Sequence, residues 1–128
     1  MKFSLKRMVS VILAVALLSS IGVMAYTQTF NPPKQGSGRV IESKIADGSM
    51  SPYVYQNVYS TETIYVLTPS SSYTYSVLAT NLMATSIPKR LNLTYNTGYG
   101  AAGMRLYLQG CPSVTSFSAY TVSGTWGA

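Results

Sequence analysis

Residues 104–109 have the sequence Met-Arg-Leu-Tyr-Leu-Gln, in which two kinds of side chain alternate. Met104, Leu106 and Leu108 fall on one side of an extended chain, because successive side chains of a β-strand point to opposite faces. A period of two is the signature of a half-buried strand. The stretch therefore predicts a strand with one face in a core and the other turned outward.

Similar runs recur along the chain, with turn residues (Gly, Pro, Ser and Asn) between them. Residues 81–90 leave the prediction open, since Leu82-Met83-Ala84 is compatible with a helical turn that Pro88 would end. Six or seven short strands favour an all-β fold, and we expect a single antiparallel β-sandwich, with a small barrel as the alternative. The other predicted strands are 39–45, 52–59, 61–67, 72–79, 91–95 and 114–126.

The first 25 residues have the organisation of a secretory signal peptide. A basic segment at residues 1–8 precedes an apolar run at residues 9–18, and Val23-Met24-Ala25 resembles an A-x-A cleavage site. We expect cleavage after Ala25, which makes the protein secreted and extracellular and limits its contact with the membrane to export. An uncleaved anchor over residues 8–25 is the alternative, at the lower limit of the length that crosses a bilayer.

Cleavage would leave one domain-sized chain, residues 26–128. Residues 26–38 contain Pro32-Pro33 and two glycines, and predict an extended, poorly packed leader before a β-sandwich domain at residues 39–128. The whole chain has a net charge of +6, but residues 26–128 carry six basic and three acidic residues and a net charge of +3. So sparse a charge does not predict a nucleic-acid-binding surface.

All eleven tyrosines lie within residues 26–128. Tyrosine favours pleated, half-buried surfaces, and a chain with so many must build part of its core from them. Exposed aromatic rings can instead stack on the faces of sugars and offer a hydroxyl as a polar group. We expect any ligand contacts to come from exposed aromatic side chains, and the candidates are Tyr53, Tyr55, Tyr59, Tyr99, Tyr107 and Trp126.

The sequence offers little for catalysis or metal binding. It contains no histidine, which excludes Ser-His-Asp and Cys-His arrangements. The acidic residues of the mature part, Glu42, Asp47 and Glu62, show no spacing typical of a glycosidase pair or a calcium site. We therefore expect no enzymatic activity, no cofactor and no metal.

Residues 98–103, Gly-Tyr-Gly-Ala-Ala-Gly, match the G-x-G-x-x-G pattern of dinucleotide-binding loops. That function needs a helix to follow the glycines and an acidic residue about 20 positions later. A predicted strand follows instead, and no acidic residue occurs after Glu62. The segment is better interpreted as a glycine-rich connection in a β-hairpin.

The only cysteine is Cys111, so the chain forms no internal disulfide. Gly110 and Pro112 flank it and predict a turn. A single thiol in an exported protein is either a buried side chain or the partner in an intermolecular disulfide, and the second alternative would give a homodimer through Cys111.

The C-terminal third carries the stretches Asn92-Leu93-Thr94-Tyr95, Met104-Arg105-Leu106-Tyr107 and Val122-Ser123-Gly124-Thr125-Trp126. In these it resembles a family of small, uncharacterised secreted proteins of Gram-positive bacteria, which are rich in Tyr, Asn and Ser. The resemblance implies an extracellular β-protein without an assigned activity, and it implies no site residues.

Together these observations favour a secreted, non-enzymatic binding or surface-interaction module, whose partner would be a cell-wall glycan or another extracellular protein. The alternative is a secreted antimicrobial or toxin-like protein that acts on the envelope of other cells. Small size, a net charge of +3 and abundant aromatic residues fit the alternative too, although no basic amphipathic helix is apparent.

Overall fold

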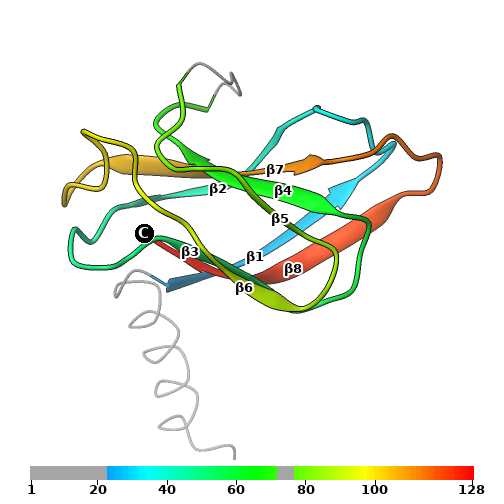
Figure 1. Ribbon diagram of the computed structural model, residues 1–128, viewed down its shortest axis with the longest axis horizontal. Helices are drawn as coiled ribbons and strands as arrows, with labels where there is room; N and C mark the ends of the chain where they lie inside the picture. The colour runs from blue at the N-terminus through cyan, green and yellow to red at the C-terminus, as the bar shows by residue number, and fades with distance from the viewer. Residues whose placement is uncertain (1–22, 72–76) are drawn as a thin grey trace, which may run out of the picture.

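The computed structural model describes residues 23–71 and 77–128, which form eight β-strands and no helix (Figure 1). The first sheet has the order β1-β8-β3-β6, the second has the order β2-β7-β4-β5, and all neighbours are antiparallel. The strands are β1 (Val23–Phe30), β2 (Arg39–Ile45), β3 (Tyr53–Gln56), β4 (Thr63–Thr68), β5 (Met83–Thr85), β6 (Lys89–Asn92), β7 (Arg105–Pro112) and β8 (Tyr120–Gly127).

The predicted all-β fold of antiparallel strands is confirmed, and β2 begins and ends at the predicted residues. The predicted number of six or seven strands is wrong, because β1 and β5 were not expected. β5 forms at Met83–Thr85, where a helical turn was an open alternative, by pairing with Thr63–Tyr65 of β4. The predicted strand at 72–79 falls mostly outside the described residues, and residues 77–79 form no strand.

The expectation of a poorly packed leader is wrong for residues 26–30, which belong to β1. Tyr26 and Phe30 are only 3% and 2% exposed, and every residue of β1 pairs with one of β8. The double proline at positions 32–33 ends the strand rather than preventing it. β1 also reaches back to Val23, upstream of the expected cleavage site, so cleavage after Ala25 would shorten it to Tyr26–Phe30.

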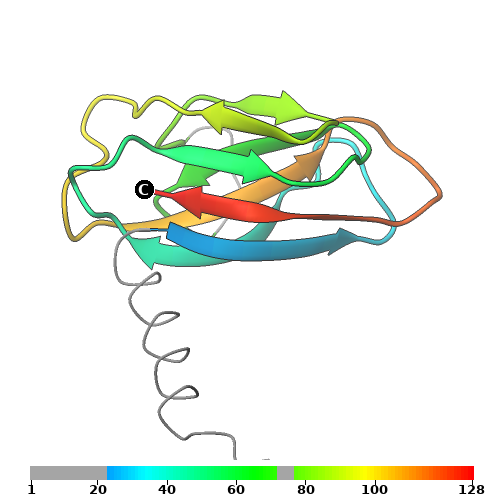
Figure 2. The same cartoon turned by 90° about the horizontal axis from the view of Figure 1, so that it is seen from below.

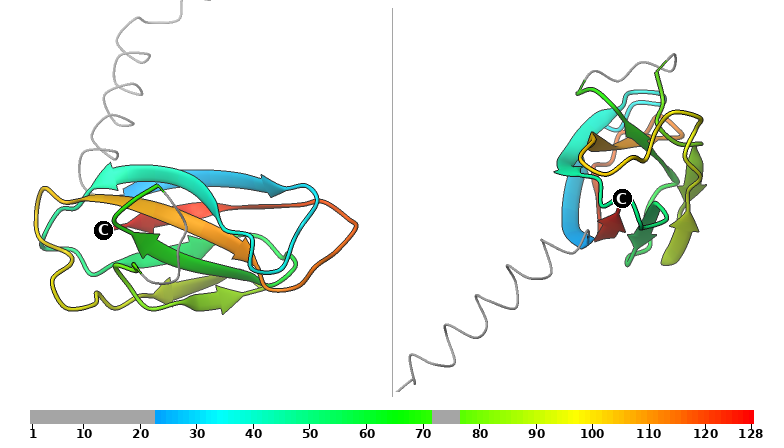
Figure 3. Two further views of the ribbon diagram at one scale, coloured as in Figure 1. Left: turned by 90° about the horizontal axis from the view of Figure 1, so that it is seen from above. Right: turned by 90° about the vertical axis from the view of Figure 1, so that its left-hand side faces the viewer.

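The core lies between the inner faces of the two sheets, which surround it when the molecule is seen from its end (Figure 3). Each sheet contributes buried side chains at alternate positions of its strands. The first sheet supplies Tyr26, Phe30, Val54, Leu91, Val122 and Trp126, and the second supplies Tyr65, Leu67, Leu106 and Leu108.

Consecutive strands run in opposite directions along the sandwich, so their connections gather at its two ends (Figure 2). The β2–β3 and β6–β7 connections lie beside Ala128, at what we call the C-terminal end. The β1–β2, β3–β4, β5–β6 and β7–β8 connections lie at the opposite end, which we call the distal end. The C-terminal end is on the left in Figure 1 and the distal end on the right.

The side chain of Glu42, in β2, contacts the first sheet. A register shift in β2 between Val40 and Glu42 accompanies the turn of Glu42 toward the first sheet, where its carboxylate accepts a hydrogen bond from the indole nitrogen of Trp126. Burial raises the pKa of Glu42 above its ordinary value, and the indole hydrogen bond opposes that rise only in part.

Replacing Glu42 by glutamine should flatten the dependence of stability on pH. The raised pKa means that the folded protein binds more protons than the unfolded chain just above pH 4.5, so the free energy of unfolding falls as pH rises through that window. Glu42→Gln keeps an acceptor for Trp126 but removes the charge, and the variant should be more stable than the wild type near neutral pH. Urea denaturation between about pH 4 and pH 8 measures this. Parallel curves for the two proteins would contradict it.

Candidate functional site

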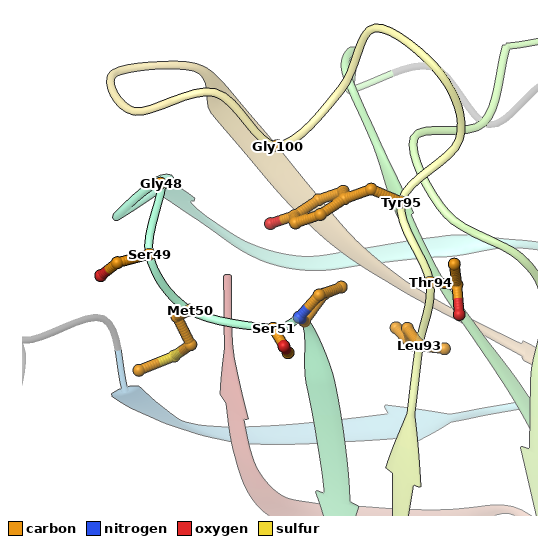
Figure 4. Close-up of a pocket in the computed structure, with 9 residues that line it drawn as sticks. Gly48, Ser49, Met50, Ser51, Leu93, Thr94, Tyr95 and Gly100 are labelled. Atoms are coloured by element: carbon orange, nitrogen blue, oxygen red, sulfur yellow. The ribbon is translucent and has the colours of Figure 1, made fainter.

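A pocket of about 480 Å³ opens at the C-terminal end of the sandwich, between the β2–β3 loop and the chain that follows β6 (Figure 4). Its lining comes from segments more than 40 positions apart in the sequence. The lining residues are Gly48, Ser49, Met50, Ser51, Pro52, Leu93, Thr94, Tyr95 and Gly100.

Tyr95 is the largest side chain of the pocket. Its backbone is held by an isolated bridge to Thr80, and its ring lies between Gly100 and the Ser49–Pro52 segment, with the hydroxyl toward the β2–β3 loop (Figure 4). The hydroxyl oxygen is buried and has no hydrogen-bond partner among the described residues. Burial raises the pKa of Tyr95, so the hydroxyl stays protonated at neutral pH.

Backbone hydrogen bonds fix the two loops around the pocket. The amide of Ala46 donates to the carbonyl of Met104 at 2.7 Å, and the amide of Gly103 donates back to the carbonyl of Ala46 at 3.0 Å. The amide of Leu93 donates to the carbonyl of Pro52 at 2.9 Å, which joins the pocket's two walls. The pocket is therefore largely preformed.

The lining combines apolar surface with neutral polar groups. Met50, Pro52, Leu93 and the ring of Tyr95 supply the apolar part, while serine and threonine hydroxyls supply the polar part. None of the described residues that line the pocket has a charged side chain. In the part of the chain that the structure describes, no group of three or more His, Cys, Asp or Glu residues could hold a metal ion. Such a lining suits an uncharged ligand that has both hydroxyl groups and an apolar face.

The aromatic residues proposed from the sequence do not come together in one site, and none of them lines the pocket. On β3, Tyr53 is covered by the guanidinium of Arg90, 4.0 Å from its ring centroid, while Tyr55 is 39% exposed. Tyr59 is 79% exposed but lies at the distal end. Tyr99 and Tyr107 are half-buried.

Trp126 cannot serve as a ligand contact in this structure, which corrects the expectation. Its side chain is fully buried in the core and its indole nitrogen is bonded to Glu42. The ring anchors the end of β8 between the two sheets.

Sequence reasoning missed the pocket residues. The sequence pattern places Tyr95 in the predicted strand 91–95 and indicates no other role for it. The same pattern predicts that the glycines at 98–103 connect the two strands of a β-hairpin. That prediction is wrong, because β6 belongs to the first sheet and β7 to the second, so the segment crosses between sheets. Gly98, Gly100 and Gly103 all have positive φ. Their clustering beside an aromatic residue was the available signal.

Two of these glycines provide a matched test of the pocket wall. Gly98 and Gly100 have φ of +92° and +98°, so alanine at either position is strained by roughly 1–2 kcal/mol. At Gly98 an added Cβ meets nothing within 4 Å, whereas at Gly100 it would lie 2.5 Å from Cδ2 of Tyr95. Gly100→Ala should therefore destabilise the protein by about 3 kcal/mol or more, against about 1–2 kcal/mol for Gly98→Ala. Equal losses in urea denaturation would contradict the packing of Gly100 on Tyr95.

Cys111 lies within β7, opposite Ile64 of β4, and not at a turn as the flanking residues predicted. It is 1% exposed, and its sulfur is 3.5 Å from the carbonyl oxygen of Pro112. A disulfide between two folded copies would require this thiol to reach the surface. The structure thus gives no support to a homodimer through Cys111.

Burial makes the reactivity of Cys111 a probe of unfolding. A thiol reagent such as dithionitrobenzoate should modify the native protein far more slowly than the protein in denaturant, because the thiolate must be accessible to react. The increase of absorbance with time, recorded for the native protein and in denaturant, gives the two rates of modification. Rapid stoichiometric labelling of the native protein, or a dimer that reductant dissociates, would contradict the buried position.

Among the described residues, no helix is long and apolar enough to cross a membrane. The chain matches no family model, no curated protein and no solved structure. Its resemblance to small secreted proteins of Gram-positive bacteria therefore stays a prediction.

Proposed function

We propose that the protein is a secreted, non-enzymatic binding module, and that the pocket at its C-terminal end binds a neutral saccharide unit of an extracellular glycan. One observation carries the proposal: the buried hydroxyl of Tyr95, without a partner among the described residues, belongs to a ring in the wall of an uncharged pocket. A buried hydroxyl without a partner costs free energy, and a ligand's hydrogen bond would recover it once a small movement of the pocket wall uncovers the hydroxyl.

Two further properties support a saccharide. Sugars present hydroxyl groups at their edges and C–H groups on their faces, and aromatic rings pack against those faces. The pocket offers the corresponding set, with serine and threonine hydroxyls beside apolar side chains. Its volume of about 480 Å³ is also within the range of small-molecule sites.

Isothermal titration with an N-acetylglucosamine trisaccharide tests the proposal. Tyr95→Phe removes only the hydroxyl and should weaken binding about 10-fold. Tyr107→Phe is the matched control, since Tyr107 is a half-buried tyrosine outside the pocket, and it should leave affinity unchanged. Absence of binding, or equal weakening by both variants, would contradict the proposal.

Export is tested separately, in a secreting host. Protein recovered from the medium should begin at Tyr26 when its N-terminus is sequenced. Protein retained in the cells with its first residues intact would contradict cleavage after Ala25.

A further inference from the structure

Four loops form the distal end of the sandwich (Figure 1), and three of them carry exposed large apolar side chains. Phe117, in the β7–β8 loop, is 103% exposed, and Val114 of the same loop is 50% exposed. Tyr59 of the β3–β4 loop is 79% exposed, and Ile87 of the β5–β6 loop is 48% exposed. Isolated exposed apolar residues are common, but four on neighbouring loop tips indicate an interaction surface.

Hydrogen bonds join these loops into one surface. The amide of Ser60 donates to the carbonyl of Ser86 at 2.9 Å, which links the β3–β4 and β5–β6 loops. The amide of Ser113, at the start of the β7–β8 loop, donates to the carbonyl of Glu62 at 3.0 Å. The amide of Ser116 donates to the carbonyl of Pro33 at 3.1 Å, which adds the β1–β2 loop. The apolar tips are thus held together.

Basic side chains accompany the apolar tips. Lys34 lies in the β1–β2 loop, Arg39 is the first residue of β2 and Lys89 is the first residue of β6, and all three are exposed. The acidic residue at this end is Glu62, whose carboxylate accepts a hydrogen bond from the hydroxyl of Ser113 at 2.8 Å. These four charged residues give the distal end a net charge of +2.

Exposed apolar side chains flanked by basic side chains are complementary to a surface whose negatively charged outer layer covers an apolar interior. Aromatic side chains favour the interface between lipid headgroups and acyl chains. Lysine and arginine near an anionic bilayer each strengthen binding about fivefold. We propose that the distal end docks onto an anionic phospholipid bilayer, with Phe117 entering the interface and Lys34, Arg39 and Lys89 facing the headgroups. This surface is separate from the saccharide pocket, at the other end of the molecule.

Tryptophan fluorescence in the full chain tests the proposal. Phe117→Trp places a reporter at the distal end, and Ile45→Trp places one at an exposed apolar position, 46% exposed, at the C-terminal end. Trp126 is buried in both variants and gives a common background. The probes are vesicles of phosphatidylcholine with phosphatidylglycerol, and of phosphatidylcholine alone, each with brominated acyl chains that quench nearby tryptophan.

With the anionic vesicles, emission from position 117 should shift to shorter wavelength and be quenched, while emission from position 45 should not change. High salt should reverse the effect, because it screens charges on exposed surfaces. In the Phe117→Trp background, replacing both Lys34 and Lys89 by alanine should lower the vesicle partition coefficient about 30-fold.

Several outcomes would overturn the proposal. Attachment through the apolar residues 9–18, which precede β1, would bring the C-terminal end to the bilayer and quench position 45 instead. Equal quenching by the zwitterionic vesicles, or no effect of removing both lysines, would remove the role of charge. A blue shift at position 117 without vesicles would show that a second protein copy covers this end.

Discussion

Gly124→Ala is expected to unfold the sandwich or to destabilise it by about 4 kcal/mol or more. A Cβ added at Gly124 would lie 1.7 Å from the carbonyl oxygen of Tyr55 and 3.2 Å from Cα of Gln56. Both are backbone atoms of β3, the strand that pairs with β8 in the middle of the first sheet. No side-chain rotation can relieve the conflict, so the two central strands would have to separate. Urea denaturation followed by circular dichroism measures the loss.

Thr125→Ala is the matched control for this substitution. Thr125 is the next residue of β8, half-buried, with its side chain on the opposite face of the strand. Its truncation should cost about 1 kcal/mol or less. If the two variants differ by less than about 1 kcal/mol, the close approach of β8 to β3 is not as the structure shows.

Strand β8 also shows how much of the fold could be predicted from the sequence. Val122, Gly124 and Trp126 belong to the stretch that carries the resemblance to small secreted proteins, and each has a structural role: Val122 and Trp126 are fully buried, and Gly124 admits β3. The sequence pattern could show that these residues alternate. It could not show which strand lies against the glycine, because strand pairing depends on contacts distant in the sequence.

Alternation predicted a strand well in β7, where apolar and more polar residues alternate over the six positions 104–109. The pattern in β2 is weaker, and after its register shift Lys44 is buried while Ile45 is exposed. Alternation failed for β1, where polar Thr27 and Thr29 alternate with Tyr26, Gln28 and Phe30, and only two of the three inward positions are aromatic. It failed for β5 because three residues are too few to show a period. The pocket was beyond such patterns altogether, since its shape depends on positive φ at glycines and on two loops that meet only in the folded chain.

A chain of buried polar side chains crosses the core and carries the second large prediction. The hydroxyl of Tyr65, from the second sheet, donates to the side-chain carbonyl of Gln56 in the first sheet. The hydroxyl of Tyr26 lies 3.2 Å from that of Tyr65 and 3.2 Å from the carbonyl oxygen of Tyr55. The amide nitrogen of Gln56 continues the chain to the carbonyl of Val58 at 2.8 Å. The chain therefore links both sheets.

Tyr65→Phe should destabilise the protein by about 2–3 kcal/mol, even though it leaves the ring in place. Gln56 is fully buried, and without the Tyr65 hydroxyl its carbonyl oxygen loses the donor that the structure gives it. Stranding a buried acceptor costs more than the hydrogen bond itself contributes. Tyr55→Phe is the control, because Tyr55 is 39% exposed. Equal effects of the two variants in urea denaturation would contradict the role of the chain.

Alkaline pH should distinguish the variant from the wild type in a second way. Burial raises the pKa of Tyr26 to about 12, and burial raises the pKa of Tyr65 as well, from an ordinary value of 10.0. Above pH 10 the unfolded chain loses these protons while the folded protein keeps them, so the free energy of unfolding falls as pH rises. The stabilisation is fully present below pH 10. Tyr65→Phe removes one of the two groups, and its stability should fall less steeply between about pH 10 and pH 12, which brings the two curves together. Curves that stay parallel over that range would mean that Tyr65 ionises as readily in the folded protein as in the unfolded chain, and hence that its hydroxyl is not held in the core.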